Sequence, residues 1–140
     1  MRKKTYELLE HTADIRIRVK AASLKSLFKT AAVAMFDIIA EKKRPGAKPE
    51  KKFTVKQSAE TKEELFINWL NELLSLSAIK EIIFTQFQIK TLDENRIEAI
   101  LAGIPLAQYT VNKEIKAATY HELEIKKTLK GWQAEVIFDV

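Results

Sequence analysis

The sequence has 140 residues, a net charge of +5, 46% hydrophobic residues and no cysteine, which predicts a single globular domain with a substantial core. Without cysteine, and with only two histidines, disulfides, iron–sulfur clusters and the common zinc sites are excluded, so a bound metal would take oxygen ligands. No apolar run approaches the roughly 20 residues of a membrane span and no signal sequence is visible, so we expect a cytoplasmic protein.

Two strands are predicted at the start of the chain, over Thr5–Leu9 and Ile15–Val19. In the second, apolar residues alternate with Arg16, Arg18 and Lys20, so that one face is apolar and the other is basic. Half-exposed antiparallel strands have this pattern, and we expect solvent to cover the basic face.

A first helix is predicted from the N-cap residue Ser23 to about Ala40. Its apolar residues share one face, and Asp37 lies away from that face as an exposed acid. The segment Lys42–Lys52 then forms a basic connection with a turn at Pro45-Gly46. We expect a solvated loop there, with contact to phosphate or to an acidic protein as the alternative. It contains no aromatic residue on which nucleic-acid bases would stack.

A third strand is predicted over Phe53–Ser58, and Thr61 with Glu64 forms a capping box that starts a second helix running to about Ile79. The apolar residues of this helix wrap more than half of its circumference. It should therefore be the central core element, packed against both a sheet and the first helix. Within its narrow polar stripe, Asn71-Glu72 is expected to form a hydrated edge, with a ligand role as the alternative.

The rest of the chain is predicted to be extended. The expected segments are a hairpin of Ile82–Leu92 and Arg96–Leu101, a stretch over Leu106–Val111, and two final strands, Lys116–Lys126 and Trp132–Phe138. In the first of these final strands, His121 has the same parity as two apolar residues, so a buried imidazole is expected. Helices do not alternate with strands, which predicts an α+β fold with a mixed, largely antiparallel sheet packed with two main helices.

Acidic residues at the two ends of the chain are the strongest candidates for chemistry. Glu10–Asp14 is rich in polar groups and lies between two strands, while Asp139 and Val140 close the sequence. If the first and last strands are neighbours, Asp14, Asp139 and the Val140 carboxylate converge. Two carboxylates with water suffice for a weak Mg²⁺ or Ca²⁺ site. Taken alone, Asp14 suits an Asx turn and Asp139 suits a solvated chain end.

Two further residues carry open alternatives. His11 either orients Asp14, binds metal or fills the loop. Lys116 is either a surface lysine or, beside carboxylates, a point charge for phosphate. The three glycines are scattered and form no phosphate-binding loop, so nucleotide chemistry would take place in a partner.

Five motifs in the same order resemble the archease family over essentially the whole chain. They are Glu10-His11-Thr12-Ala13-Asp14, Ala34-Met35-Phe36-Asp37, Trp69-Leu70-Asn71-Glu72-Leu73-Leu74, Lys116-Ala117-Ala118-Thr119-Tyr120-His121 and Val136-Ile137-Phe138-Asp139-Val140.

The resemblance implies a small α+β protein, residues 1–140 forming one archease-like domain, that assists an RtcB-type RNA ligase in tRNA splicing. That ligase joins 2′,3′-cyclic phosphate or 3′-phosphate ends to 5′-hydroxyl ends after loading a guanylate onto its own histidine. Archeases accelerate this loading and support multiple turnover. The helper is expected to reach GTP and RNA through the ligase, without turnover of its own and without a membrane.

The resemblance also implies site residues. Family acids that form a divalent-metal site, with Mg²⁺ or Ca²⁺, match Asp14 and Asp139, and the family lysine matches Lys116. Further candidates for the same patch are the Val140 carboxylate, His11, Asp37, Glu72 and His121.

Two other function classes remain open. A basic RNA-binding module would use Arg16, Arg18, Lys20 and the Lys42–Lys52 segment, and its affinity would fall steeply with salt. A stand-alone metal-dependent phosphohydrolase would use the same acids as the metal site.

Overall fold

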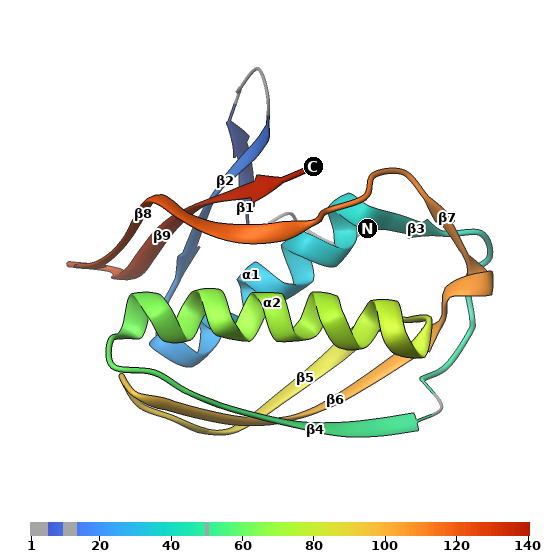
Figure 1. The fold of residues 1–140 in the computed structure, drawn as a ribbon, viewed down its shortest axis with the longest axis horizontal. Coiled ribbons are helices and arrows are strands. Elements are labelled where there is room, and N and C mark those ends of the chain that lie inside the picture. Colours follow the sequence, from blue (N-terminus) through green and yellow to red (C-terminus); the bar gives the residue numbers. More distant parts are fainter. Residues whose placement is uncertain (1–5, 10–13, 50) are drawn as a thin grey trace.

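The computed structural model describes residues 6–9, 14–49 and 51–140, which form two main antiparallel sheets with two helices between them (Figure 1). The four-stranded sheet has the order β1-β2-β9-β8, with β1 Tyr6–Leu9, β2 Asp14–Ala21, β9 Gly131–Asp139 and β8 Ala117–Thr128. The three-stranded sheet has the order β4-β6-β5, with β4 Lys51–Ser58, β6 Arg96–Pro105 and β5 Ile82–Leu92. Two short strands, β3 Ala40–Lys42 and β7 Tyr109–Val111, pair with each other.

The α+β prediction is confirmed, and every strand pairing among the described residues is antiparallel. Both predicted helix starts are also confirmed. In α1, Leu24–Ile39, the Ser23 hydroxyl accepts a hydrogen bond from the Ser26 backbone N–H at 3.1 Å. In α2, Lys62–Lys80, the Thr61 hydroxyl accepts one from the Glu64 N–H at 3.1 Å. Each cap satisfies a backbone donor that a helix start leaves without an intrahelical partner.

Helix α2 is the central core element, as its apolar circumference predicts. It lies between the two main sheets and also contacts α1 (Figure 1). Trp69 is fully buried, and its indole Nε1–H donates to the Phe28 backbone oxygen at 3.0 Å. Phe28 and Phe66 pack edge to face with ring centroids 5.1 Å apart. Fully burying one such side chain contributes roughly 1.5–3 kcal/mol, so this cluster fixes α1 against α2.

Some elements differ from the sequence prediction. The stretch expected to be extended over Leu106–Val111 begins with a 3-10 turn, Leu106–Gln108, and only then becomes β7. The sequence does not predict strand β3, because three residues are too few to show a period of two. The basic connection is consequently shorter, lying between the end of β3 and Lys51.

Strand β8 contains a large bulge that changes which residues face the core. Thr119 pairs with Ile137, but the next pair is Glu124 with Glu135, so β8 advances five residues while β9 advances two. Before the bulge, the residue facing the core has an even number, as at Ala118, and after the bulge it has an odd number, as at Ile125. Both of these residues are buried. Within the bulge, His121 has a 69% exposed side chain. The expected buried imidazole is wrong, because the alternation assumed an unbroken strand.

No helix in the described part of the chain combines the length and apolar character needed to cross a membrane.

Candidate functional site

Asp14 and Asp139 are direct partners across the β2–β9 pair, so the start of β2 and the end of β9 meet at one end of the two central strands of the four-stranded sheet. Directly opposed residues of an antiparallel pair have Cβ atoms about 4.5–5.5 Å apart and share a face. Asp139 is exposed and Asp14 is half-buried. Two like charges in these positions repel each other, and a cation between them would remove that cost.

Lys116 lies next to this pair. Its backbone N–H donates to the Asp139 carbonyl oxygen at 2.8 Å, and its side chain is exposed. The following residue, Ala117, is the direct β8 partner of Asp139. Asp14 and Asp139 are therefore paired on adjacent strands, and the Lys116 backbone, one residue before β8, is hydrogen-bonded beside them.

Asn71 of α2 holds this part of β8 in place. Its side-chain amide donates to the Ala118 carbonyl at 3.1 Å, and its side-chain oxygen accepts from the Ala118 N–H at 2.8 Å. This residue was expected to form a hydrated edge, but it hydrogen-bonds both backbone groups of Ala118 in the outer strand β8. A periodicity analysis cannot find such a contact, because it joins residues that are 47 positions apart.

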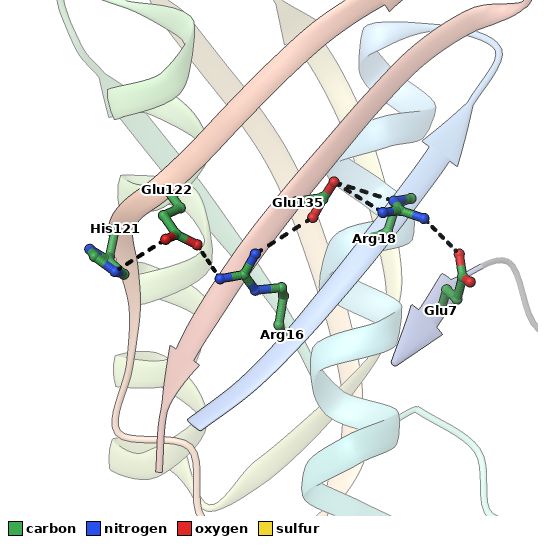
Figure 2. Close-up of polar contacts among 6 residues, drawn as sticks. All are labelled: Glu7, Arg16, Arg18, His121, Glu122 and Glu135. Carbon is green, nitrogen blue, oxygen red and sulfur yellow. Dashed lines mark hydrogen bonds and ion pairs between the residues drawn. The ribbon is translucent and has the colours of Figure 1, made fainter. Parts of the chain in front are cut away.

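A ladder of alternating charges crosses the outer face of the four-stranded sheet, next to the acid pair. Figure 2 shows its order, from His121 and Glu122 in the β8 bulge through Arg16, Glu135 and Arg18 to Glu7 in β1. The distances are 3.7 Å for His121–Glu122, 3.9 Å for Arg16–Glu135, 3.3 Å for Arg18–Glu135 and 3.4 Å for Arg18–Glu7. Arg16 also pairs with Glu122.

This ladder corrects the expectation that the basic face of β2 is simply solvated. The Arg16 and Arg18 side chains are only 22% and 32% exposed and are neutralised by acids from three other strands. Lys20 alone of the three is exposed as expected. Arg16 occupies the position two residues after Asp14 on the same face, so the middle of the ladder, at Arg16, lies beside the acid pair.

The remaining candidates are distributed as follows. Asp37 is half-buried in the last turns of α1 rather than fully exposed. The Glu72 carboxylate lies 3.4 Å from the Gln57 amide of β4, which directs it toward the three-stranded sheet. His121 lies at the β8 end of the ladder, where it contacts Glu122. Val140 follows Asp139 and packs partly against the core. His11 lies outside the described residues.

The side chains at the acid pair meet part of what a metal requires. Within residues 6–9, 14–49 and 51–140, no group of three or more histidine and acidic side chains is gathered closely enough to hold an ion. Asp14 and Asp139 supply two carboxylates, which suit a hard cation such as Mg²⁺ or Ca²⁺ but leave most coordination positions to other donors. The pair therefore fits a weak site that water or a partner protein completes.

Comparison with known sequences finds one family along nearly the full length. The profile of the Archease protein family matches residues 6–140. Protein archease from Methanosarcina mazei is 35% identical, covering 98% of this chain and 97% of that protein. Protein archease from Pyrococcus abyssi is 34% identical, covering 98% of this chain and 99% of that protein.

Solved structures are similar as well. The solution structure of protein 1598 from Methanobacterium thermoautotrophicum has a TM-score of 0.77 at 26% identity, covering 99% of this chain and 100% of that one. The crystal structure of an archease from Thermotoga maritima, described as a possible chaperone, has a TM-score of 0.66 at 22% identity, covering 100% and 98%. At that identity the second likeness supports the fold alone.

Proposed function

This chain belongs to the archease family, and from that premise we propose that it is an accessory activator of an RtcB-type RNA ligase in tRNA splicing. In this role it promotes guanylylation of the ligase and multiple turnover, and it has no turnover of its own. GTP and RNA are bound by the ligase, and this protein contributes side chains to the ligase site.

The observation that carries the proposal is the direct cross-strand pairing of Asp14 with Asp139, with Lys116 just before β8 and its backbone N–H on the Asp139 carbonyl. The three residues that match the family's acids and lysine lie far apart in sequence, yet their backbones are neighbours in the fold, and Asp139 and Lys116 are exposed. Exposed side chains are what a helper needs if it is to complete a site in another protein.

The chemistry follows from these residue types. Asp14 and Asp139 would hold a divalent cation, Mg²⁺ or Ca²⁺, which when bound supplies positive charge for a triphosphate. Lys116 provides a mobile point charge that suits a phosphate oxygen. Asn71 keeps the start of β8 beside β9, so that the lysine stays next to the carboxylates. The exposed position of Asp139 allows the ligase to approach the pair.

The test is a time course of ligase guanylylation with and without this protein. Asp14→Asn should fold normally and lose stimulation, because one carboxylate of the pair is gone. Glu94→Gln is the matched control, since it removes one exposed carboxylate from the hairpin turn of the other main sheet. Full stimulation by the Asp14→Asn protein would remove the proposed mechanism.

The two other function classes have less support. An RNA-binding module on β2 relies on Arg16 and Arg18, and these are engaged in ion pairs with acids. A metal-dependent phosphohydrolase predicts hydrolysis of a phosphoester by the purified protein with Mg²⁺ or Mn²⁺. An assay without ligase distinguishes that class from an activator.

A further inference from the structure

A second charged surface is formed by the outer face of the three-stranded sheet, the loop that covers its end, and Lys29, which reaches it from α1. Its cations are exposed, and within the described residues none of them forms an ion pair with an acid. We call this set the basic face; its members are Lys29, Arg44, Lys48 and Lys52. This is the reverse of the ladder on the other sheet, where each arginine contacts two acids.

The loop that carries two of these cations is held against the sheet. The Lys43 backbone N–H donates to the Gln108 carbonyl at 3.0 Å, and Ala47 packs partly against the core. Ile104 of β6 lies beneath this loop and is only 1% exposed. The predicted turn at Pro45-Gly46 is present, with Gly46 at φ 97°. The backbone that carries Arg44 and Lys48 is therefore held close to the sheet.

Two hollows lie on this face, and each contains two of the cations. The first has a volume of about 300 Å³ and is lined by Arg44, Lys48 and Gln108 over Ile104 and Pro105. The second, of about 240 Å³, is lined by Lys29 and Lys52 with the side chains of Gln86 and Gln88. Neither hollow, as the described residues form it, is lined by an acid. Cations with amide donors and no acid make both hollows suitable for anionic groups.

From this arrangement we propose that the basic face binds the phosphodiester backbone of double-helical RNA. Several separate cations on one face fit a chain of phosphates better than a single phosphate group. Three of the four are lysines, which contact phosphates as point charges and do not select bases.

The absence of an accessible ring favours a duplex over a single strand. Phe87 is the aromatic residue among those lining the two hollows, and it is 4% exposed and stacked on Phe36 inside the core. Single strands are bound through bases stacked on exposed aromatic rings, whereas duplex RNA is bound through shape and phosphates. An acidic protein partner is disfavoured by the same observation, because protein interfaces are anchored by buried aromatic residues.

The basic face and the acid pair belong to different sheets. In Figure 1 the four-stranded sheet, which carries the acid pair, lies at the top, whereas β4 runs along the bottom, with both helices between them. One face can therefore bind RNA while the other meets a protein. The RNA-binding inference does not depend on the ligase role, and it holds or fails separately.

The experiment measures binding of the purified full chain to a fluorescent RNA hairpin at a series of salt concentrations. The hairpin has a duplex of about 16 base pairs, which is the length that a duplex-binding domain spans. The logarithm of the affinity should fall linearly with the logarithm of salt concentration. Lys48→Gln with Lys52→Gln should lower that slope by about two, roughly one for each lysine that no longer meets a phosphate. At about 50 mM salt we expect this double variant to bind roughly tenfold more weakly or worse.

The matched control is Lys20→Gln with Lys130→Gln, which removes the same charge at exposed positions of the four-stranded sheet, in β2 and in the turn between β8 and β9. The control should retain the wild-type slope and affinity. Equal weakening by both double variants would assign the binding to net charge and overturn the proposal. No measurable duplex binding by the wild type at low salt would overturn it as well.

Three competitor arms define the ligand. A single-stranded RNA of equal length, inorganic triphosphate and a polyglutamate peptide should each displace the duplex less well than unlabelled duplex does. Displacement by triphosphate at an equal concentration of phosphate groups would show a simple phosphate site instead. Stronger displacement by the single strand or by the peptide would likewise contradict a duplex-binding face.

Discussion

Asn71 and Ala118 form a reciprocal pair of hydrogen bonds, in which one side chain satisfies both the N–H and the carbonyl of a strand residue. The pair joins the central helix to the strand that begins one residue after Lys116. A helix side chain thus takes the part of a neighbouring strand at this point.

Replacing Asn71 by Asp should destabilise the protein by about 1–3 kcal/mol, because the oxygen that replaces Nδ2 faces the Ala118 carbonyl and cannot donate to it. Urea unfolding gives the free-energy change. Asn68→Ala is the matched control on the same helix, since its amide makes only a 3.5 Å contact with the Ser58 carbonyl, and it should cost much less. Equal costs for the two variants would show that the Asn71 contacts are energetically unimportant.

The charge ladder leads to a second prediction, that Glu135→Gln destabilises the protein more than Glu122→Gln does. Glu135 contacts both arginines and its side chain is 28% exposed, whereas Glu122 is 52% exposed and contacts one arginine. Exposed ion pairs contribute about 0–1 kcal/mol each, so we expect the difference to be of that order and to shrink at high salt. Unfolding free energies of both variants at two ionic strengths test this ranking, which a reversed order would refute.

Two glycines with left-handed backbones offer a matched comparison. A Cβ at Gly131, where φ is 139°, would lie 2.3 Å from the Ala21 backbone oxygen, whereas a Cβ at Gly46, where φ is 97°, would meet nothing within 4 Å. Gly46→Ala should therefore cost only the backbone strain, about 1–2 kcal/mol. Gly131→Ala should cost more, because backbone atoms of the β2 end must also move. Thermal unfolding of both variants measures the difference, and similar melting temperatures would contradict the expected clash.

The caps at Ser23 and Thr61 could be predicted because they depend on residues within one turn of each other. The meeting of Asp14 and Asp139 was predictable only as a condition, namely that the first and last strands are neighbours. The β8 bulge was not predictable, since it depends on Glu122 adopting φ 55° while its carboxylate reaches Arg16 on another strand. For the same reason the exposure of His121 was wrongly predicted. Local patterns specify elements, whereas long-range partners decide which side chains face outward.

The last prediction concerns the Asp139 carboxylate. Without a divalent cation it should lower the free energy of unfolding slightly, and with a bound cation it should raise that free energy. In a chelator, Asp139→Asn should be as stable as the wild type or more stable by a few tenths of a kcal/mol, because it removes a like charge opposite Asp14. With Mg²⁺ or Ca²⁺ at about 100 times its dissociation constant, the wild type should gain about 2.7 kcal/mol and the variant much less. Chemical unfolding in both conditions measures which of the two proteins is more stable in each. Glu94→Gln controls for the loss of one negative charge. If the cation stabilises the wild type and Asp139→Asn equally, the ion binds elsewhere and the acid pair is not its site.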